Sequence, residues 1–246
     1  MTGKRQLKNW VKALGELLFP PRCYCCGATA ISISEGLCCE CLAGVLYIVA
    51  PICRICGGNF ITSQPENHVC ECCLRHRPPY SMARGIIYYE EPVRSLLHNL
   101  KYSYDTAAAD PLLKIARSFD FSAFDSCEIF LPVPLHRQRL KRRGFNQALF
   151  LARLLFPGRN DCIFPQILRK RYHTRSQTEL DAIGRKQNLR SAFVVEHSEI
   201  IINKKICLVD DVYTTGTTVS ECAATLMRAG ASEVRVLTFA RVREFR

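Results

Sequence analysis

The chain has 246 residues, 48% of them hydrophobic, which is enough to bury the core of one sizeable α/β domain and a small second unit. No apolar run is long enough to span a bilayer, so we expect no integral membrane segment. The N-terminal segment is charged where an export signal needs an apolar centre, which predicts a cytoplasmic protein.

The net charge of +12 is concentrated in one segment. Residues 135–190 contain 14 basic and three acidic residues, a net of +11, whereas the remainder carries a net of +1. Such a concentration often marks only a solvated face, but it also suits a polyanionic ligand.

The first elements in chain order are a short helix and a cysteine-rich region. Leucines and Trp10 at helical spacing predict an amphipathic helix over residues 1–19. Eleven of the 15 cysteines lie between Cys23 and Cys73. Without an export signal, disulfides are disfavoured and metal is the better interpretation.

Four CxxC pairs in this region predict about two structural zinc ions, because each such turn brings two thiolates to one tetrahedral ion. A site of four thiolates has no open position for water, so these ions are not expected to be catalytic. The spacing leaves open whether sequential or crossed pairs share an ion. Residues 20–77 are therefore predicted to form a double zinc-ribbon domain, with the ligands Cys23, Cys26, Cys38, Cys41, Cys53, Cys56, Cys70 and Cys73.

Residues 80–246 alternate between strand and helix patterns. We expect strands at 83–90, 128–133, 205–209 and 233–240, with short strands near Ile167 and Phe193, and helices at 92–100, 107–119, 145–156 and 217–229. This alternation is typical of a doubly wound parallel α/β sheet. Ligands of such sheets bind at the carboxyl ends of the strands.

The stretch ICLVDDVYTTGTT, residues 206–218, places two acids and a threonine loop at such an end. It lacks the lysine of a P-loop, and Tyr213 and Cys222 stand where an EF-hand needs ligands. A threonine loop that runs into a helix N-terminus offers N–H groups and hydroxyls to a phosphate. Two adjacent carboxylates accept hydrogen bonds from a vicinal diol, so the pattern indicates a ribose 5-phosphate.

This stretch resembles the signature of type I phosphoribosyltransferases, which bind phosphoribosyl pyrophosphate (PRPP). Together with the CxxC pairs, LKY at 100–102, PVPLH at 132–136 and RRGFNQA at 142–148, it resembles the ComF family, which includes ComFC and GntX-like proteins. The resemblance implies a phosphoribosyltransferase-like parallel sheet after a small zinc-ribbon domain, with PRPP bound together with magnesium. It assigns the ribose hydroxyls and the chemistry to Asp210 and Asp211, and the 5-phosphate to Thr214, Thr215, Gly216, Thr217 and Thr218.

The resemblance also gives the basic segment a purpose. The loop at 132–137 is expected to approach the pyrophosphate, and a hood over approximately 169–190 to close over the site. Candidate phosphate contacts are Lys101, Arg137, Arg143 and Arg175. No motif in the chain identifies the acceptor substrate.

Two functions remain open at this level. One is a magnesium-dependent phosphoribosyltransferase. The other is a non-catalytic PRPP sensor that binds single-stranded DNA through its basic segment and its zinc-ribbon domain. Tyr80, Phe145 and Tyr172 are the aromatic candidates for stacking on bases. Either function fits the role in DNA uptake or in the use of DNA as a nutrient that the resemblance implies, with proteins of the uptake machinery as possible partners.

Overall fold

The computed structural model describes residues 20–29, 35–60, 66–103, 108–171 and 192–243, without the side chains of 101–103 and 142. Several predictions fall outside these residues. They are the helix over 1–19 and the hood residues 172–190, with Arg175 and Tyr172.

The chain divides into two compact units. The first comprises the described parts of residues 1–45 and 91–117 and contains α2 (Cys39–Ala43), α4 (Val93–Ser103) and α5 (Ala109–Ala116). Within this unit the Asn99 side chain donates a hydrogen bond to the Tyr24 carbonyl (2.9 Å), and Arg117 pairs with Glu35 (2.7 Å). The two CxxC pairs nearest the N-terminus thus share a unit with helices that follow more than 40 residues later in the sequence, after strand β1 (Met82–Tyr88).

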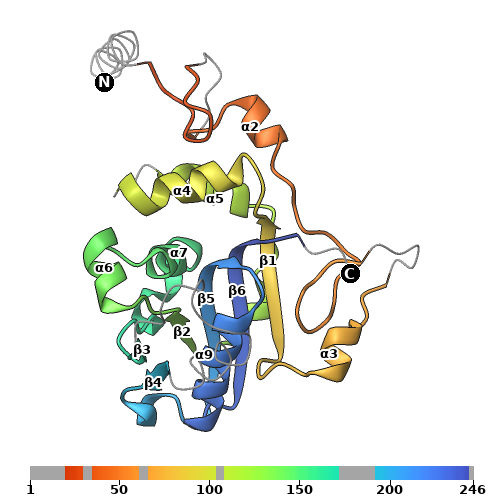
Figure 1. The fold of residues 1–246 in the computed structure, drawn as a ribbon, viewed down its shortest axis with the longest axis vertical. Helices are drawn as coiled ribbons and strands as arrows, with labels where there is room; N and C mark the ends of the chain where they lie inside the picture. Colours follow the sequence, from red (N-terminus) through yellow and green to blue (C-terminus); the bar gives the residue numbers. More distant parts are fainter. Residues whose placement is uncertain (1–19, 30–34, 61–65, 104–107, 172–191, 244–246) are drawn as a thin grey trace, which may run out of the picture. The chain divides into compact units, whose positions relative to one another are not determined.

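The second unit, from the described parts of residues 46–90 and 118–246, is built on a four-stranded sheet (Figure 1). All strand pairs are parallel, which confirms the predicted sheet. Residues 206–209 of β5 and residues 236–241 of β6 are continuously buried, as expected for the inner strands of a parallel sheet covered on both faces. The strand order is β1-β6-β5-β2, with β1 (Met82–Tyr88), β2 (Ile129–Pro132), β5 (Lys205–Tyr213) and β6 (Glu233–Arg241).

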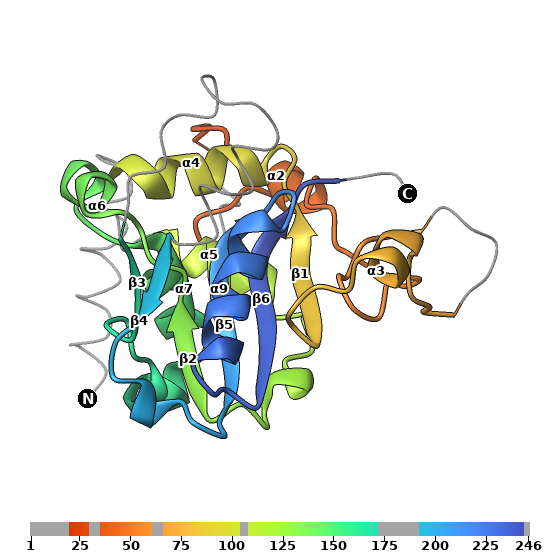
Figure 2. The same ribbon diagram turned by 60° about the horizontal axis from the view of Figure 1, so that its bottom comes forward.

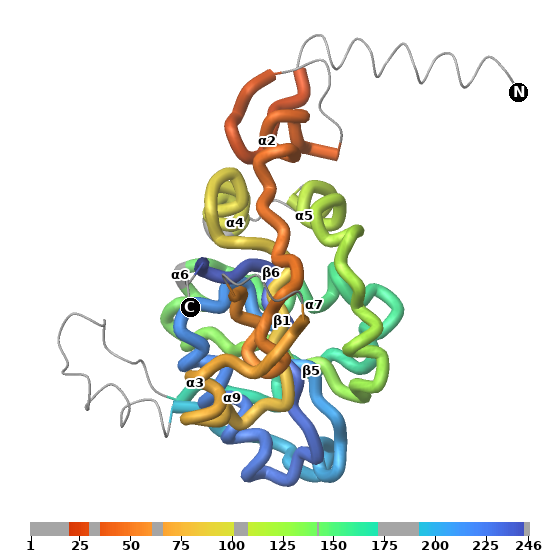
Figure 3. Tube along the Cα trace, turned by 90° about the vertical axis from the view of Figure 1, so that its right-hand side faces the viewer, coloured from red at the N-terminus to blue at the C-terminus, as the bar shows by residue number. Residues whose placement is uncertain are grey.

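The helices α7 (Gln147–Leu155) and α9 (Thr217–Arg228) cover opposite faces of this sheet (Figures 2 and 3). After β2 the chain passes through α7 and returns at Ile163, which forms a parallel bridge with Phe130 of β2. After β5 it passes through α9 to β6, in the other direction across the sheet. Strand order therefore reverses between β2 and β5, and this is where sheets of this type bind ligands.

The structure differs from the sequence-based expectations in three places. The short strands β3 (Leu168–Lys170) and β4 (Phe193–Val195) form a separate antiparallel pair. Helix α6 (Arg137–Arg143) was not expected, because its single apolar residue, Leu140, gives no periodic pattern. Strand β5 extends to Tyr213, beyond its apolar run, because the β6 ladder continues to that residue. The remaining elements of the described residues are α3 (Glu71–Arg75) and the 3-10 turns Ser122–Phe124, Pro157–Cys162 and Ser198–Ile200.

Within the described part of the chain, every helix is too short or too polar to cross a membrane.

Candidate functional site

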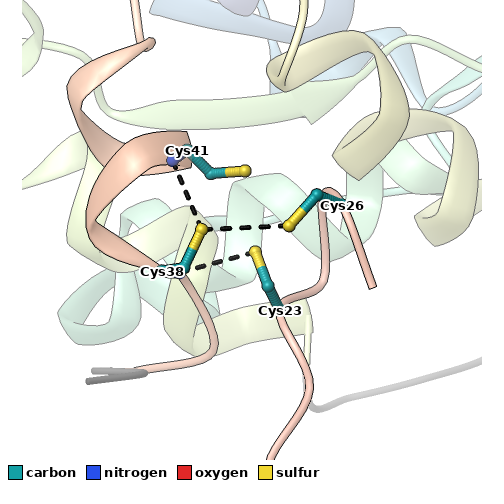
Figure 4. Close-up of side chains that lie close together, drawn as sticks. All are labelled: Cys23, Cys26, Cys38 and Cys41. Carbon is teal, nitrogen blue, oxygen red and sulfur yellow. Dashed lines mark hydrogen bonds between the residues drawn. The ribbon is translucent and has the colours of Figure 1, made fainter. Parts of the chain in front are cut away.

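Four cysteines of the first unit converge on one point (Figure 4). Their sulfur atoms all lie within 4.8 Å of one another, and the Cys26 and Cys38 sulfurs are 3.8 Å apart. Zinc–sulfur bonds of about 2.3 Å place the sulfurs of a tetrahedral site about 3.8 Å apart. Cys23, Cys26, Cys38 and Cys41 therefore fit a structural zinc ion.

A second cluster of the same kind lies in the second unit. Cys53, Cys56, Cys70 and Cys73 also have all sulfurs within 4.8 Å, with 3.7 Å between those of Cys56 and Cys70. These two groups answer the question that spacing left open, because the CxxC pairs combine sequentially. The clusters differ in burial: all four cysteines of the second are at most 5% exposed, whereas Cys26 of the first is exposed.

Each cluster contains one cysteine whose thiol pKa is lowered by its surroundings. Burial acts to raise the pKa of Cys23 and of Cys53, but neighbouring backbone N–H groups that point at each sulfur outweigh it and lower both values to about 6. Since zinc binds the thiolate, this geometry favours the metal-binding form at neutral pH.

The acidic pair lies in the last part of β5 rather than after it. Asp210 and Asp211 are both half-buried, and the backbone N–H of Asp211 donates to Asp210 Oδ1 (2.9 Å). The neighbouring strand β2 ends alongside, where the Val133 N–H donates to the Val209 carbonyl (2.8 Å). The predicted ribose and pyrophosphate segments thus lie at adjacent strand ends, where strand order reverses.

The threonine loop connects β5 to α9. Thr214, Thr215 and Thr217 are exposed, and the Thr215 and Thr217 hydroxyls are 2.8 Å apart. Gly216 is the N-cap residue of α9, with φ +75° and no side-chain cap. Gly216 has no side chain to cap this 12-residue helix, and the Thr217 N–H donates to Thr215 Oγ1 (3.5 Å), so N–H groups and hydroxyls gather at a site suited to a phosphate.

The predicted basic residues are only partly brought to this site. Arg137 and Arg143 begin and end α6, which follows the end of β2, and Arg137 is exposed. Lys101 lies in α4 of the first unit, and its side chain is not among those described.

Lys170, at the end of β3, was missed because it stands within a run of basic residues that gives no sign of its position. Burial lowers the pKa of Lys170, and Arg139 lowers it further, whereas Cys222 and Asp210 act in the opposite direction. Its ammonium group is therefore within electrostatic reach of Asp210.

A pocket of ≈ 690 Å³ lies beside α6 and α7. Its walls combine aromatic and basic side chains, among them Arg137, Phe145, Phe150, Arg153 and Arg169. Of the other stacking candidates, Tyr80 was a wrong prediction, because it is 3% exposed and its hydroxyl is 2.9 Å from that of Tyr213.

Family models match both parts of the chain. Residues 14–74 match the double zinc ribbon domain, and residues 140–245 match the phosphoribosyl transferase domain. The parallel sheet, the two cysteine clusters and the two family matches together define the class: a protein with a phosphoribosyltransferase domain and an N-terminal double zinc ribbon.

The similar curated proteins narrow this class to one family. The DNA utilization protein YhgH of Salmonella typhimurium is 31% identical over 225 residues, covering 89% of this chain and 96% of that protein. Competence protein F of Haemophilus influenzae is 30% identical over 227 residues, with the same coverage. Competence protein ComFC of Bacillus subtilis is 26% identical over 217 residues, covering 84% of this chain and 85% of that protein. The chain belongs to the ComF family.

Proposed function

We propose that this protein binds PRPP at the junction of β5 and α9. The observation that carries the proposal is the threonine loop with its left-handed Gly216 at the start of α9, which follows the strand β5 that carries Asp210 and Asp211. The N–H groups and hydroxyls of Thr214–Thr218 would hold the 5-phosphate, and the two carboxylates would accept hydrogen bonds from the ribose hydroxyls.

The arrangement suits displacement at C1 of the ribose. A bond forms from an acceptor to C1, the bond from C1 to pyrophosphate breaks, and the proton of the acceptor passes to Asp211. Such a reaction needs stabilisation of charge more than a strong base. Basic side chains near the end of β2, with Arg137 and Arg143 as candidates, would neutralise the departing pyrophosphate. Magnesium bound with PRPP would supply further charge neutralisation.

The biological role follows from the relatives. Because similar proteins are named for DNA utilization and competence, we place this protein in DNA uptake or the use of DNA as a nutrient. Proteins of the uptake machinery are the expected partners. Reduced cysteine clusters favour the cytoplasm as its location.

A second candidate function is favoured by the pocket beside α7. Phe145 and Phe150 offer faces for base stacking, and the arginines around them offer contacts to phosphates. Single-stranded DNA would bind here whether PRPP is a substrate or only a sensed ligand.

The direct test follows pyrophosphate release from labelled PRPP in the presence of magnesium and of candidate purine, pyrimidine and amine acceptors. Release that depends on one acceptor supports the transferase. PRPP binding without release from any acceptor supports the sensor, and absence of PRPP binding contradicts both.

A further inference from the structure

We propose that Tyr213 and Arg241 are positioning residues that hold the threonine loop and couple it to the second cysteine cluster. Metal at this cluster, rather than at the first, then maintains the loop. That the loop binds PRPP rests on the proposed function. The coupling between the second cluster and the loop is a property of the fold, and hydrogen exchange of the loop amides measures it separately.

The second cluster is built into the same core as the sheet. Its turn lies directly against β1, because the Ala83 N–H donates to the Ile55 carbonyl (2.6 Å). Gly57, with φ +70°, follows Cys56, and a Cβ there would lie 2.4 Å from the Ala83 carbonyl oxygen. The cluster therefore cannot shift without moving the edge strand of the sheet.

Arg241, at the end of β6, connects this cluster to the sheet. It is 2% exposed, and its Nη1 donates to the Cys56 carbonyl (2.6 Å). Its Nη2 is buried and has no hydrogen-bond partner among the described residues. A buried guanidinium is costly without a compensating charge.

The cluster provides that charge when metal is bound, because four thiolates outweigh one divalent ion. Loss of the metal would free the turn that carries Cys56, and with it the carbonyl that accepts the hydrogen bond from Arg241.

Arg241 in turn contacts Tyr213, its partner in the β5–β6 ladder. The guanidinium carbon lies 4.1 Å from the centre of the Tyr213 ring, a cation–π contact shielded from water. The ring is also fixed at its far end, where the Tyr213 and Tyr80 hydroxyls are 2.9 Å apart.

The last contact reaches the loop itself. A Cβ on Gly216 would lie 2.0 Å from the Tyr213 hydroxyl oxygen, so this hydroxyl packs directly against the left-handed residue that starts α9. One continuous set of contacts thus runs from Cys56 through Arg241 and Tyr213 to Gly216. The first cluster belongs to the other compact unit.

The experiment measures hydrogen exchange of the amides of residues 214–218 and PRPP affinity in full-length variants of known zinc content. Tyr213→Phe removes the hydroxyl that packs against Gly216 and that lies 2.9 Å from the Tyr80 hydroxyl, and Arg241→Met removes the charge beside the cluster. Cys70→Ser and Cys26→Ser weaken the second and first clusters respectively. Arg235→Met, at the other end of β6, is the matched arginine control, and protection of β5 amides verifies folding.

We expect Tyr213→Phe, Arg241→Met and Cys70→Ser each to accelerate exchange in the loop at least tenfold and to weaken PRPP binding by a similar factor. Arg241→Met should also accelerate release of zinc from the second cluster, and Arg241→Lys should restore part of each property. Cys26→Ser and Arg235→Met should leave loop exchange unchanged. Unchanged loop exchange in folded Tyr213→Phe and Arg241→Met would overturn the proposal, whether or not the wild type binds PRPP. If these variants accelerate loop exchange as expected but the wild type does not bind PRPP, the proposed function alone is refuted.

Discussion

At the residue scale, Gly216 combines two requirements. Its φ of +75° lies in the left-handed region, where a side chain costs about 1–2 kcal/mol. The Tyr213 hydroxyl also fills the space that a Cβ would need. Only glycine meets both conditions.

We predict that Gly216→Ala destabilises the protein by at least about 1–2 kcal/mol, from the backbone conformation alone. It should also weaken PRPP binding, because the loop must move away from Tyr213. Denaturant unfolding and calorimetry measure these effects. Gly158→Ala is the control, since nothing lies within 4 Å of a Cβ there. Equal stability and PRPP affinity in the two variants would contradict the packing described here.

At the element scale, α2 and α3 are too short to be stable alone. Each has five residues and begins after a cysteine of a cluster, Cys38 or Cys70. Isolated helices shorter than about 12–15 residues are marginal in water. Structural zinc contributes on the order of 10–16 kcal/mol of apparent binding free energy in zinc-finger peptides, and so stabilises such turns.

Metal analysis of the purified protein should therefore give about two zinc ions per chain. Cys38→Ser should lower this to about one, because a ligand of the first cluster is lost. Cys39→Ser changes an adjacent exposed cysteine outside the cluster and should leave the zinc content unchanged. A zinc content of zero, or disulfides within these pairs, would refute the two metal sites.

At the scale of the whole molecule, the concentration of charge in residues 135–190 governs the expected affinity for nucleic acid. Binding of single-stranded DNA should weaken steeply with salt, with a log–log slope of about −0.7 per phosphate neutralised. Phe145→Ala should weaken DNA binding without changing this slope, because a stacking ring carries no charge. Arg153→Ala should make the slope less steep, because one cation is lost. Fluorescence anisotropy of labelled oligonucleotides measures both quantities.

Competition identifies where the DNA binds. PRPP should displace DNA if the pocket beside α6 and α7, whose wall includes Arg137 after the end of β2, shares that end with the PRPP site. It should not displace DNA if the zinc-ribbon domain makes the contact instead. If no binding is detectable at low salt, the basic segment serves phosphate groups of PRPP alone.

The sequence predicted the parts of the fold that leave local signals. The CxxC pairs, the buried strands and the stretch 206–218 could be recognised because ligand spacing, apolar runs and turn residues are all local. The structure confirms two cysteine clusters and a parallel sheet. The domain boundaries 1–19, 20–77 and 80–246 stay a proposal.

Other features depend on contacts between residues far apart in the chain. The division of the two clusters between different units has no local signal. Tyr80 was interpreted as an exposed aromatic, although its partner Tyr213 is 133 residues away. Arg241 was indistinguishable from a surface arginine, because its burial against Cys56 is set by the packing of β1 and β6.

The central claim is that Asp210, Asp211 and the threonine loop bind PRPP, and calorimetric titration with PRPP and magnesium tests it most directly. Asp211→Ala removes a charged acceptor from the ribose hydroxyls, which should cost about 1.5–3 kcal/mol. This corresponds to a Kd about 10- to 150-fold higher than that of the wild type. Asp161→Ala, an exposed acid in the turn after α7, should bind PRPP as the wild type does. No PRPP binding by the wild type, or equal affinity of the wild type and Asp211→Ala, would contradict the account.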